Sequence, residues 1–468
     1  MKHFMRMLLS IGIGLASWSA SAFAQEAWTE PLRLERAVEL AKANYPAIRA
    51  ARAQAGAAEA GVEIARNAYL PRTEIDWQQT RGTRNNIFGQ FFPQAAIPPI
   101  SGPVFGESSF RDSAWGSGGG LLFSWEPFDF GLRRANVKLA DRVSDEAKAR
   151  AALTEFDVAI AAADAFLRAI ASEQAVRAAQ ANVERMETFA KAVRVLVENE
   201  LRPGADASRA EAELAAARNT LIQTRQQAAL ARVALTEAIG MAGQSIVLDA
   251  GNVLDGAPPS LLEVSAGFTA HPLMLAQKAS LDTVVARRHV LDRSFFPRFN
   301  WQTAVFGRGT GARVDGRLLD NRGFFPDTPN WATGLTISFA PTDIFNLRAR
   351  RKQEENHLAA EQARHDEALQ RLKAEEARAR ALAESAREYA ENAPRQLEAA
   401  RETELRVRKR YEAELSTVTE VAEAQRLLTQ AEVDQALARL ALWRARLAEA
   451  RARGDLAPFL DQLQGRTK

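Results

Sequence analysis

The sequence predicts a mainly α-helical protein that also contributes β-strands to a membrane barrel. Three observations predict this fold class. The chain contains an internal duplication, each copy contains two strand-like segments, and each copy contains helical segments too long for a compact domain. The composition agrees, because Ala, Glu, Arg and Leu dominate long stretches, as they do in extended helices and coiled coils.

The first 24 residues have the pattern of a secretory signal peptide. Basic residues open the chain, an apolar run covers residues 7–16, and the small-x-small sequence Ala22-Phe23-Ala24 precedes Gln25. This pattern is typical of an exported protein rather than of a membrane helix. We expect the mature chain to begin near Gln25, outside the cytoplasm.

No later apolar run reaches the roughly 20 residues of a membrane helix. The chain has no cysteine, so we expect no disulfide, no thiolate metal site and no lipid anchor on an N-terminal cysteine. A membrane-bound form would have to enter the bilayer as β-strands. The 61 basic and 58 acidic residues nearly balance, which fits long solvated helices better than a nucleic-acid-binding face.

The duplication has two series of matching motifs. In the first series a motif recurs 226 positions later, and in the second it recurs 214 positions later, so an insertion or deletion separates the series. The matching segments are 44–46 with 270–272, 69–72 with 295–298, 124–127 with 338–341, and 200–201 with 414–415. Such long repeats indicate two copies of one structural unit.

The duplication sets the expected domain boundaries. After a signal peptide at 1–24, the first repeat spans 25–243, with strands near 72–84 and 113–127 and helices near 132–202 and 205–239. A connecting segment at 244–262 leads to the second repeat at 263–453, with strands near 298–307 and 331–340 and helices near 347–414 and 417–453. A C-terminal tail follows at 454–468.

Local patterns justify these elements. Pro46 and Pro272 suit the first turn of a helix, where the missing N–H has no partner in any case. Residues 73–78 alternate between Thr, Ile or Trp and acidic or amide side chains, which is the period of a strand. The segments 85–111 and 308–330 are rich in Gly, Pro, Asn and Phe and are expected to form large surface loops.

The long helices exclude a compact domain. Residues 132–202 contain neither Gly nor Pro, and a helix of that length spans roughly 100 Å at about 1.5 Å per residue. Pro394 lies inside the corresponding helix of the second repeat. Because proline removes a backbone donor, we expect it to kink or break that helix.

Four strands per chain are too few to close a membrane barrel, because such barrels begin at about eight strands. An open edge in hydrocarbon leaves backbone N–H and C=O groups unpaired, so we expect several chains to share one barrel. Aromatic residues near the strand ends would form interfacial girdles, or alternatively would pack a soluble sheet against helices. They are Trp77, Trp115, Trp125, Trp301, Trp331 and Phe339.

Four motifs occur at the ends of these elements: residues 32–46, Tyr69-Leu70-Pro71, residues 125–131 and residues 411–425. With the duplication they resemble the TolC family of outer-membrane efflux proteins over essentially the whole mature chain. The resemblance implies a homotrimer with a twelve-stranded barrel, in contact with outer-membrane lipid, and a periplasmic α-helical tunnel. It also implies the channel of a tripartite efflux or type I secretion system, with a periplasmic adaptor (membrane fusion) protein and an inner-membrane pump or transporter as partners.

The resemblance also assigns roles at the helical turns. Glu420 and Glu423 match an acidic ring at the periplasmic aperture; the alternative is two solvated carboxylates neutralised by Arg426 or Arg209. Asp206 and Tyr411 match an inter-helix latch. The basic partner of that latch falls at Ser416, so Arg202, Arg209 or Arg410 would have to replace it. The glycine that the family has at each turn is Glu200 in the first repeat and Glu414 in the second.

The turns themselves are the expected adaptor-docking surface, and the alternative is two ordinary hairpin turns without a partner. The residues are Leu201, Arg202, Pro203, Gly204, Leu415, Ser416 and Thr417. The five histidines are scattered and no phosphate loop or nucleophile motif is present, so we expect no enzyme activity, no metal and no cofactor. A periplasmic coiled-coil adaptor or scaffold is the main alternative function, and a passive porin is a third.

Overall fold

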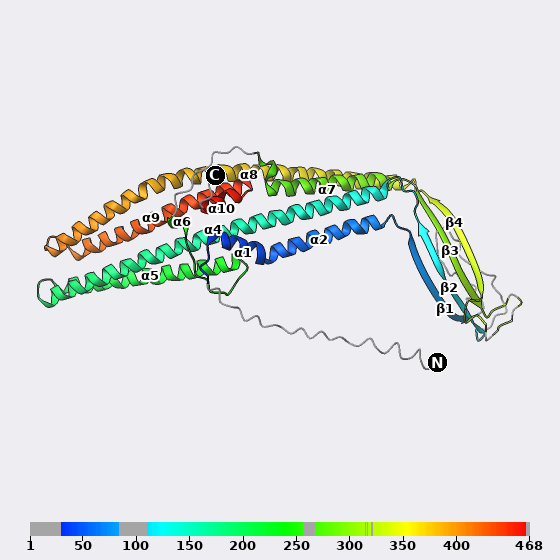
Figure 1. Ribbon diagram of the computed structural model, residues 1–468, viewed down its shortest axis with the longest axis horizontal. Coiled ribbons are helices and arrows are strands. Elements are labelled where there is room, and N and C mark those ends of the chain that lie inside the picture. Colours follow the sequence, from blue (N-terminus) through cyan, green and yellow to red (C-terminus); the bar gives the residue numbers. More distant parts are fainter. Residues whose placement is uncertain are drawn as a thin grey trace.

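The computed structural model describes residues 30–83, 110–255 and 267–464, apart from 314, 316, 320 and 321. The molecule is elongated, with long helices at one end and a four-stranded sheet at the other (Figure 1). The turns between the long helices lie farthest from the sheet. The predicted signal peptide, most of the predicted loop 85–111 and part of the connecting segment 244–262 lie outside the described residues.

The described elements follow one another along the chain as helices, a strand pair and a helical hairpin, twice over. They are α1 (Leu34–Asn44), α2 (Pro46–Asn67), β1 (Arg72–Thr83), β2 (Ser113–Trp125), α4 (Leu132–Glu198), α5 (Gly204–Ala238), α6 (Asn252–Asp255), the 3-10 helix η2 (Phe268–Ala270), α7 (Pro272–Ser294), β3 (Arg298–Thr310), β4 (Thr328–Ser338), α8 (Asp343–Glu412), α9 (Val418–Arg453) and α10 (Ala457–Leu463).

Several expected boundaries shift by a few residues. The helix expected at 132–202 ends at Glu198, because the chain reverses direction at the following residues. The strand expected at 298–307 runs to Thr310, because Thr310 still pairs with Gly116 of β2. The strand expected at 331–340 begins at Thr328, because Thr328 pairs with Arg308. The helix expected at 347–414 already begins at Asp343, whose N–H donates to the Ala340 carbonyl.

Helix α8 runs without interruption through Pro394, so of the expected kink or break, the break is wrong. Proline removes one backbone donor, but the helix packs closely on both sides of it. Ala393 is fully buried, and Ala400 joins Leu428 and Ala431 of α9 in one apolar cluster. This packing holds the helix together where one hydrogen bond is missing.

The sheet is antiparallel, with the strand order β1-β2-β3-β4. Successive residues of a strand point to opposite faces, so one face has polar side chains such as Glu74 and Asp76. The other face exposes a set of large apolar side chains, and no described helix covers it (Figure 1). They are Ile75, Trp77, Trp301, Val305, Trp331, Leu335 and Ile337.

The largest apolar core lies midway along the molecule, where α1, α6 and α10 pack against α4 and α9; we call it the waist core. Phe166 of α4 and Phe459 of α10 are fully buried there. Phe459 packs edge-on against Trp443 of α9, with the ring centroids 6.0 Å apart. The expected C-terminal tail 454–468 therefore contains a helix that completes this core.

The start of α7 meets the end of α9 at the buried His271. Its Nδ1 accepts a hydrogen bond from the Leu273 N–H at 3.1 Å, which caps α7, and its Nε2 lies 3.0 Å from the Arg451 carbonyl oxygen. A neutral ring protonated on Nε2 satisfies both contacts, whereas a charged ring cannot accept from Leu273. Burial lowers the pKa of His271 and outweighs the Arg451 carbonyl, which raises it.

This capping predicts a pH-dependent stability. The neutral ring stabilises the fold fully above the pKa of an unfolded histidine, about 6.5, and the contribution is lost as the pH falls through the lowered folded-state pKa. We expect His271→Asn, which caps without titrating, to flatten the decrease in melting temperature between pH 7.5 and pH 5, measured by circular dichroism. The exposed His357→Asn is the control and should keep the wild-type slope; an equal slope in His271→Asn would contradict the assignment.

Candidate functional site

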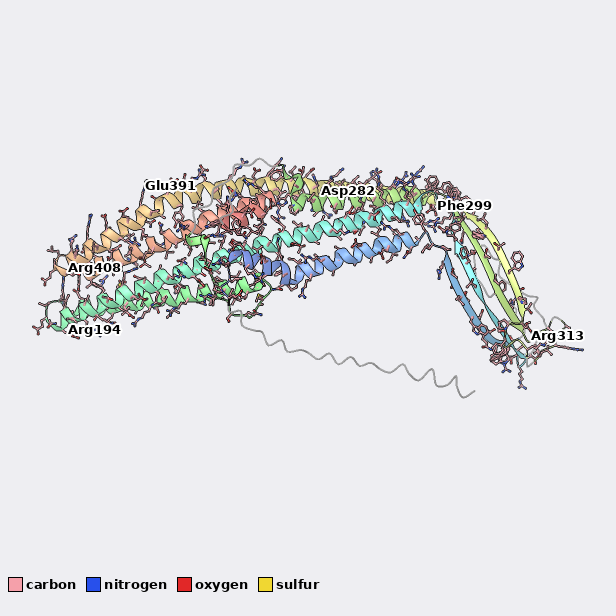
Figure 2. All side chains as sticks on the ribbon, in the orientation of Figure 1. Arg194, Asp282, Phe299, Arg313, Glu391 and Arg408 are labelled. Atoms are coloured by element: carbon pink, nitrogen blue, oxygen red, sulfur yellow. The ribbon has the colours of Figure 1, made fainter. Side chains whose placement is uncertain are left out.

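The helical tips form the first candidate site. Helix α4 turns into α5 at residues 199–203, and α8 turns into α9 at residues 413–417. One apolar cluster joins the two hairpins, and it includes Val193 of α4, Ala210 of α5 and Tyr411 of α8. Figure 2 labels Arg194 and Arg408 near these two tips. The turns that sequence analysis assigned to one surface therefore lie at the same end of the molecule.

Both turns have the same backbone geometry. Glu200 and Glu414 adopt left-handed φ angles of 60° and 64°. The next N–H in each turn, of Leu201 and of Leu415, donates back to the carbonyl five residues earlier, at 2.8 Å and 2.7 Å. This is the Schellman pattern, which usually has glycine at the left-handed position. The turn therefore keeps the geometry of a glycine turn although glutamate replaces glycine in both repeats.

The strain at these positions leads to a stability prediction. An L-residue in the left-handed region costs about 1 kcal/mol that glycine does not. We therefore expect Glu200→Gly and Glu414→Gly each to raise the unfolding free energy by about 1 kcal/mol, measured by denaturant titration of the helical signal. The control Glu412→Gly lies in the last turn of α8 and should lower it by about 1 kcal/mol. A loss of stability in the first two variants would exclude strain at the turns.

The two expected aperture carboxylates lie in the first turns of α9 and are exposed. Thr417 caps the helix: its hydroxyl oxygen accepts from the Glu420 N–H at 3.3 Å and the same hydroxyl lies 3.3 Å from the Glu420 carboxylate. Glu423 lies 4.0 Å from Arg426, with both side chains 74% exposed. Such an exposed pair is weak, so it leaves most of the negative field of these carboxylates in place.

The expected latch residue Tyr411 is buried and contacts the other hairpin. The Arg202 guanidinium lies 4.6 Å from the centre of its ring and donates to its backbone carbonyl at 2.9 Å. Burial raises the pKa of Tyr411, with Arg202 opposing and Asp206 reinforcing that shift. Among the described residues, the Tyr411 hydroxyl has no hydrogen-bond partner. Arg202 thus joins the tips of the two repeats within one chain.

The other residues considered for the latch have local contacts. Arg410 donates to the Leu415 carbonyl at 3.0 Å and so holds its own turn. The buried Ser416 donates to the Val407 carbonyl at 3.2 Å. Within the described ranges, no ion pair joins Asp206 to an arginine of the same chain. Of the three candidate cations, only Arg202 is brought to Tyr411.

Sequence reasoning missed a polar network just above the tips. Arg185 of α4 donates to Gln425, Thr429 and Glu432 of α9 at 2.9–3.2 Å. Gln425, itself buried, donates to Glu404 of α8 at 2.6 Å. The signal was present in the heptad-like spacing of positions 418, 421, 425, 428 and 432, where Gln and Glu occupy places that apolar residues usually fill.

The expected girdle aromatics all lie at the sheet. Near the helices, Trp125 packs edge-on against Trp301 with centroids 6.4 Å apart, and Phe339 is 49% exposed. Toward the outer end, Trp115 packs on Phe324 of the second loop at 5.2 Å. Trp77 and Trp331 are 59% and 75% exposed. The girdle role of these aromatic residues stays a prediction.

No described helix is both long enough and apolar enough to span a bilayer. No group of three or more histidine, aspartate or glutamate side chains in the described ranges could hold a metal ion.

An exposed apolar sheet joined to helices of this length has the architecture of an outer-membrane export channel. The family model for outer membrane efflux proteins matches residues 37–241 and 269–454, and the chain belongs to that family. A comparison with curated proteins finds no match.

Several solved structures share this fold. The outer-membrane channel OprN has 21% identity and a TM-score of 0.71, over 90% of this chain and 89% of that one. CusC has 14% identity and a TM-score of 0.74, over 93% and 96% of the two chains. The open state of the Neisseria gonorrhoeae MtrE outer membrane channel has 20% identity and a TM-score of 0.71, over 90% and 89%.

These findings confirm the family resemblance, the fold class and the outer-membrane location with extension into the periplasm. The chain is an outer-membrane channel protein of an efflux system. The family consists of channel proteins and not of enzymes. Membership therefore gives general support to the expectation that the chain is not an enzyme.

Proposed function

We propose that three copies of this chain form one channel, with a shared twelve-stranded barrel in the outer membrane and a helical tunnel that meets a periplasmic adaptor and, through it, an inner-membrane pump. The observation that carries the proposal is the sheet. It exposes an apolar face, and its outer strands β1 and β4 have no further strand partner among the described residues. The apolar face suits lipid, and the open edges are tolerated there only when neighbouring chains pair with them.

The strand aromatics support the placement of this sheet in the membrane. Trp125 and Trp115 lie ten residues apart on β2, or about 34 Å along the strand at roughly 3.4 Å per residue. At a tilt of about 40° this corresponds to about 26 Å, close to the height of the apolar band of an outer-membrane barrel. The aromatic residues thus have the spacing of two interfacial girdles.

The tips support contact with an adaptor. Leu201 and Leu415 are 58% and 68% exposed at equivalent points of the two turns. Arg202, Pro203 and Gly204 in one turn and Ser416 and Thr417 in the other complete the proposed docking surface. Exposed leucines at the end of helices this long gain a favourable environment when a partner covers them.

The first test places a charge on the proposed lipid face. Ile75 and Gln78 both lie on β1, on opposite faces of the sheet, and both are exposed in one chain. Arginine on a lipid face costs about 2–4 kcal/mol near the midplane, so Ile75→Arg should sharply reduce the heat-labile trimer band in outer-membrane fractions. Gln78→Arg should not. Equal trimer yields, or a soluble periplasmic monomer for the wild type, would favour the adaptor or scaffold alternative.

The second test concerns the aperture. Three copies of Glu420 and Glu423 would form a ring of six carboxylates that attracts cations in a narrow pore. We expect the double variant Glu420→Gln, Glu423→Gln to lower the cation-to-anion permeability ratio at least about twofold in planar bilayers and to weaken block by trivalent cations. Glutamine keeps the contact with Thr417, and Glu402→Gln on the exposed side of α8 is the control. Unchanged selectivity would remove these carboxylates from the aperture.

A further inference from the structure

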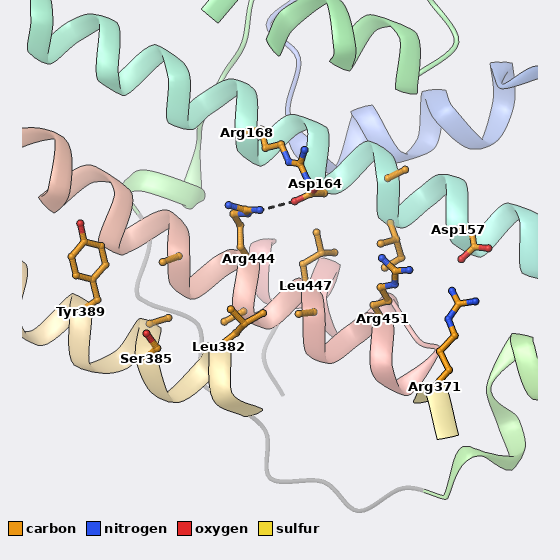
Figure 3. Close-up of a pocket in the computed structure, with 16 residues that line it drawn as sticks. Asp157, Asp164, Arg168, Arg371, Leu382, Ser385, Tyr389, Arg444, Leu447 and Arg451 are labelled. Atoms are coloured by element: carbon orange, nitrogen blue, oxygen red, sulfur yellow. Dashed lines mark ion pairs between the residues drawn. The ribbon is translucent and has the colours of Figure 1, made fainter. Parts of the chain in front are cut away.

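A cavity of about 750 Å³ lies at the waist of the molecule, between α4, α8 and α9. Figure 3 shows α9 between the other two helices, with side chains from all three around one space. We call this cavity the waist niche. Its volume is in the range of sites for drug-sized ligands, which is about 300–1,000 Å³.

The niche and most of the waist core lie on different faces of α4, with Ile160 shared by both. Residues 157, 160, 161, 164 and 168 line the niche and recur at spacings of three and four, which places them on one helical face. The waist core uses residues such as Ala159, Phe166 and Ile170, about half a turn away. The face of α4 that α1, α6 and α10 cover is therefore largely distinct from the face that lines the niche.

The size of the tunnel decides which of these sides faces inward. Four helices per chain at each level give twelve in the proposed trimer. At about 10 Å between axes, their ring has a radius of roughly 19 Å and a bore of roughly 14 Å radius once half a helix thickness is removed. If each of the three chains placed a further layer of helices, about 10 Å thick, inside the ring, these helices would nearly fill the bore. Helices α1, α6 and α10 must therefore lie outside, and the niche faces the tunnel.

The charges at the upper edge of the niche favour anions. Asp164 pairs with Arg168 of α4 at 2.5 Å and with Arg444 of α9 at 3.4 Å (Figure 3). The carboxylate is 29% exposed, whereas Arg168 is 64% exposed. One partly buried carboxylate thus pairs with two more exposed guanidinium groups. The three side chains together have a net charge of +1, and they line the cavity.

A second trio repeats the arrangement. Glu375 of α8 lies 3.3 Å from Arg371 and 3.8 Å from Arg451, and the carboxylate is 18% exposed while Arg371 is 61% exposed. Asp157 lines the niche near these arginines. Burial raises the pKa of Asp157, although Arg451 and then Arg371 oppose the shift, which makes its negative charge less favourable there.

Between the charged groups the niche is apolar. Ile160 of α4, Leu447 of α9 and several alanines contribute, and Leu382 of α8 lies at the cavity 55% exposed. An amphiphilic ligand gains from both parts, because apolar area is buried while a charged group pairs with a guanidinium.

We propose that the waist niche binds amphiphilic organic anions from within the tunnel, through the unshared charge of the Arg168–Asp164–Arg444 and Arg371–Glu375–Arg451 trios. This inference rests on the proposed trimeric channel, since that assembly places the niche inside. Anionic cargo would pause at the waist before it reaches the barrel.

The test uses naphthalene-1,5-disulfonate, an apolar ring system with two sulfonates, and the purified full-length protein in lipid discs. We expect calorimetric titration to give a dissociation constant of about 0.1 mM, with weaker binding at high salt. Arg444→Gln and Arg451→Gln should each weaken binding about fivefold to tenfold, and the double variant should abolish it. Asp157→Asn should strengthen it.

The control is Arg232→Gln on α5. Arg232 has the same 48% exposure as Arg451 and likewise pairs with a carboxylate, Glu173, but does not line the niche. It should bind the probe like the wild type. Equal binding by the Arg444→Gln, Arg451→Gln double variant would overturn the inference.

The two proposals fail in different ways. A wild-type protein that forms no outer-membrane trimer would overturn the proposed channel. A trimer that conducts ions normally but binds the disulfonate no better than it binds uncharged naphthalene-1,5-diol would overturn the waist niche alone.

Discussion

Backbone hydrogen bonding at the edges of a four-stranded sheet constrains the rest of this molecule. Strands β1 and β4 end the sheet of one chain, and the same sheet exposes Ile75, Val305 and Leu335 on one face. In water the apolar face would be unfavourable, and in lipid the edges would be. The proposed closure with neighbouring chains would resolve both problems, and the helices below would then follow the same three-fold arrangement.

The waist lies between the sheet and the tips, and it contains the joint at which one shorter helix ends and the next begins beside the long helices. Helix α9 ends where α7 begins, at a joint where Gly454 adopts a φ of 77° and a Cβ on it would lie 2.6 Å from the Pro272 ring. His271 caps α7 and contacts the last turn of α9 across this joint. Helices α9 and α7 thereby lie end to end beside α4 and α8. The waist core packs on this joint, and in the proposed trimer the charged niche would lie on the tunnel side.

At the tips, apolar packing and buried polar contacts have separate tasks. The cluster around Tyr411 and Val193 holds the hairpins together. The network of Arg185, Gln425 and Glu404 fixes their register, because buried polar groups must keep their partners. Outward from both, Glu420 and Glu423 remain in solvent at the start of α9.

The sequence alone determined the elements that depend on local pattern. The duplication, the period of two after Pro71, and the absence of Gly and Pro over residues 132–202 were enough to predict the strands and the long helices. Tertiary packing decided the rest, because it compensates for local defects and joins residues distant in the chain. It carried α8 through Pro394, held Glu200 in a glycine-like turn, and brought Arg202 to Tyr411, 209 positions away. It also brought together the niche arginines from three helices. The positions of these arginines along the chain do not predict that they lie close together.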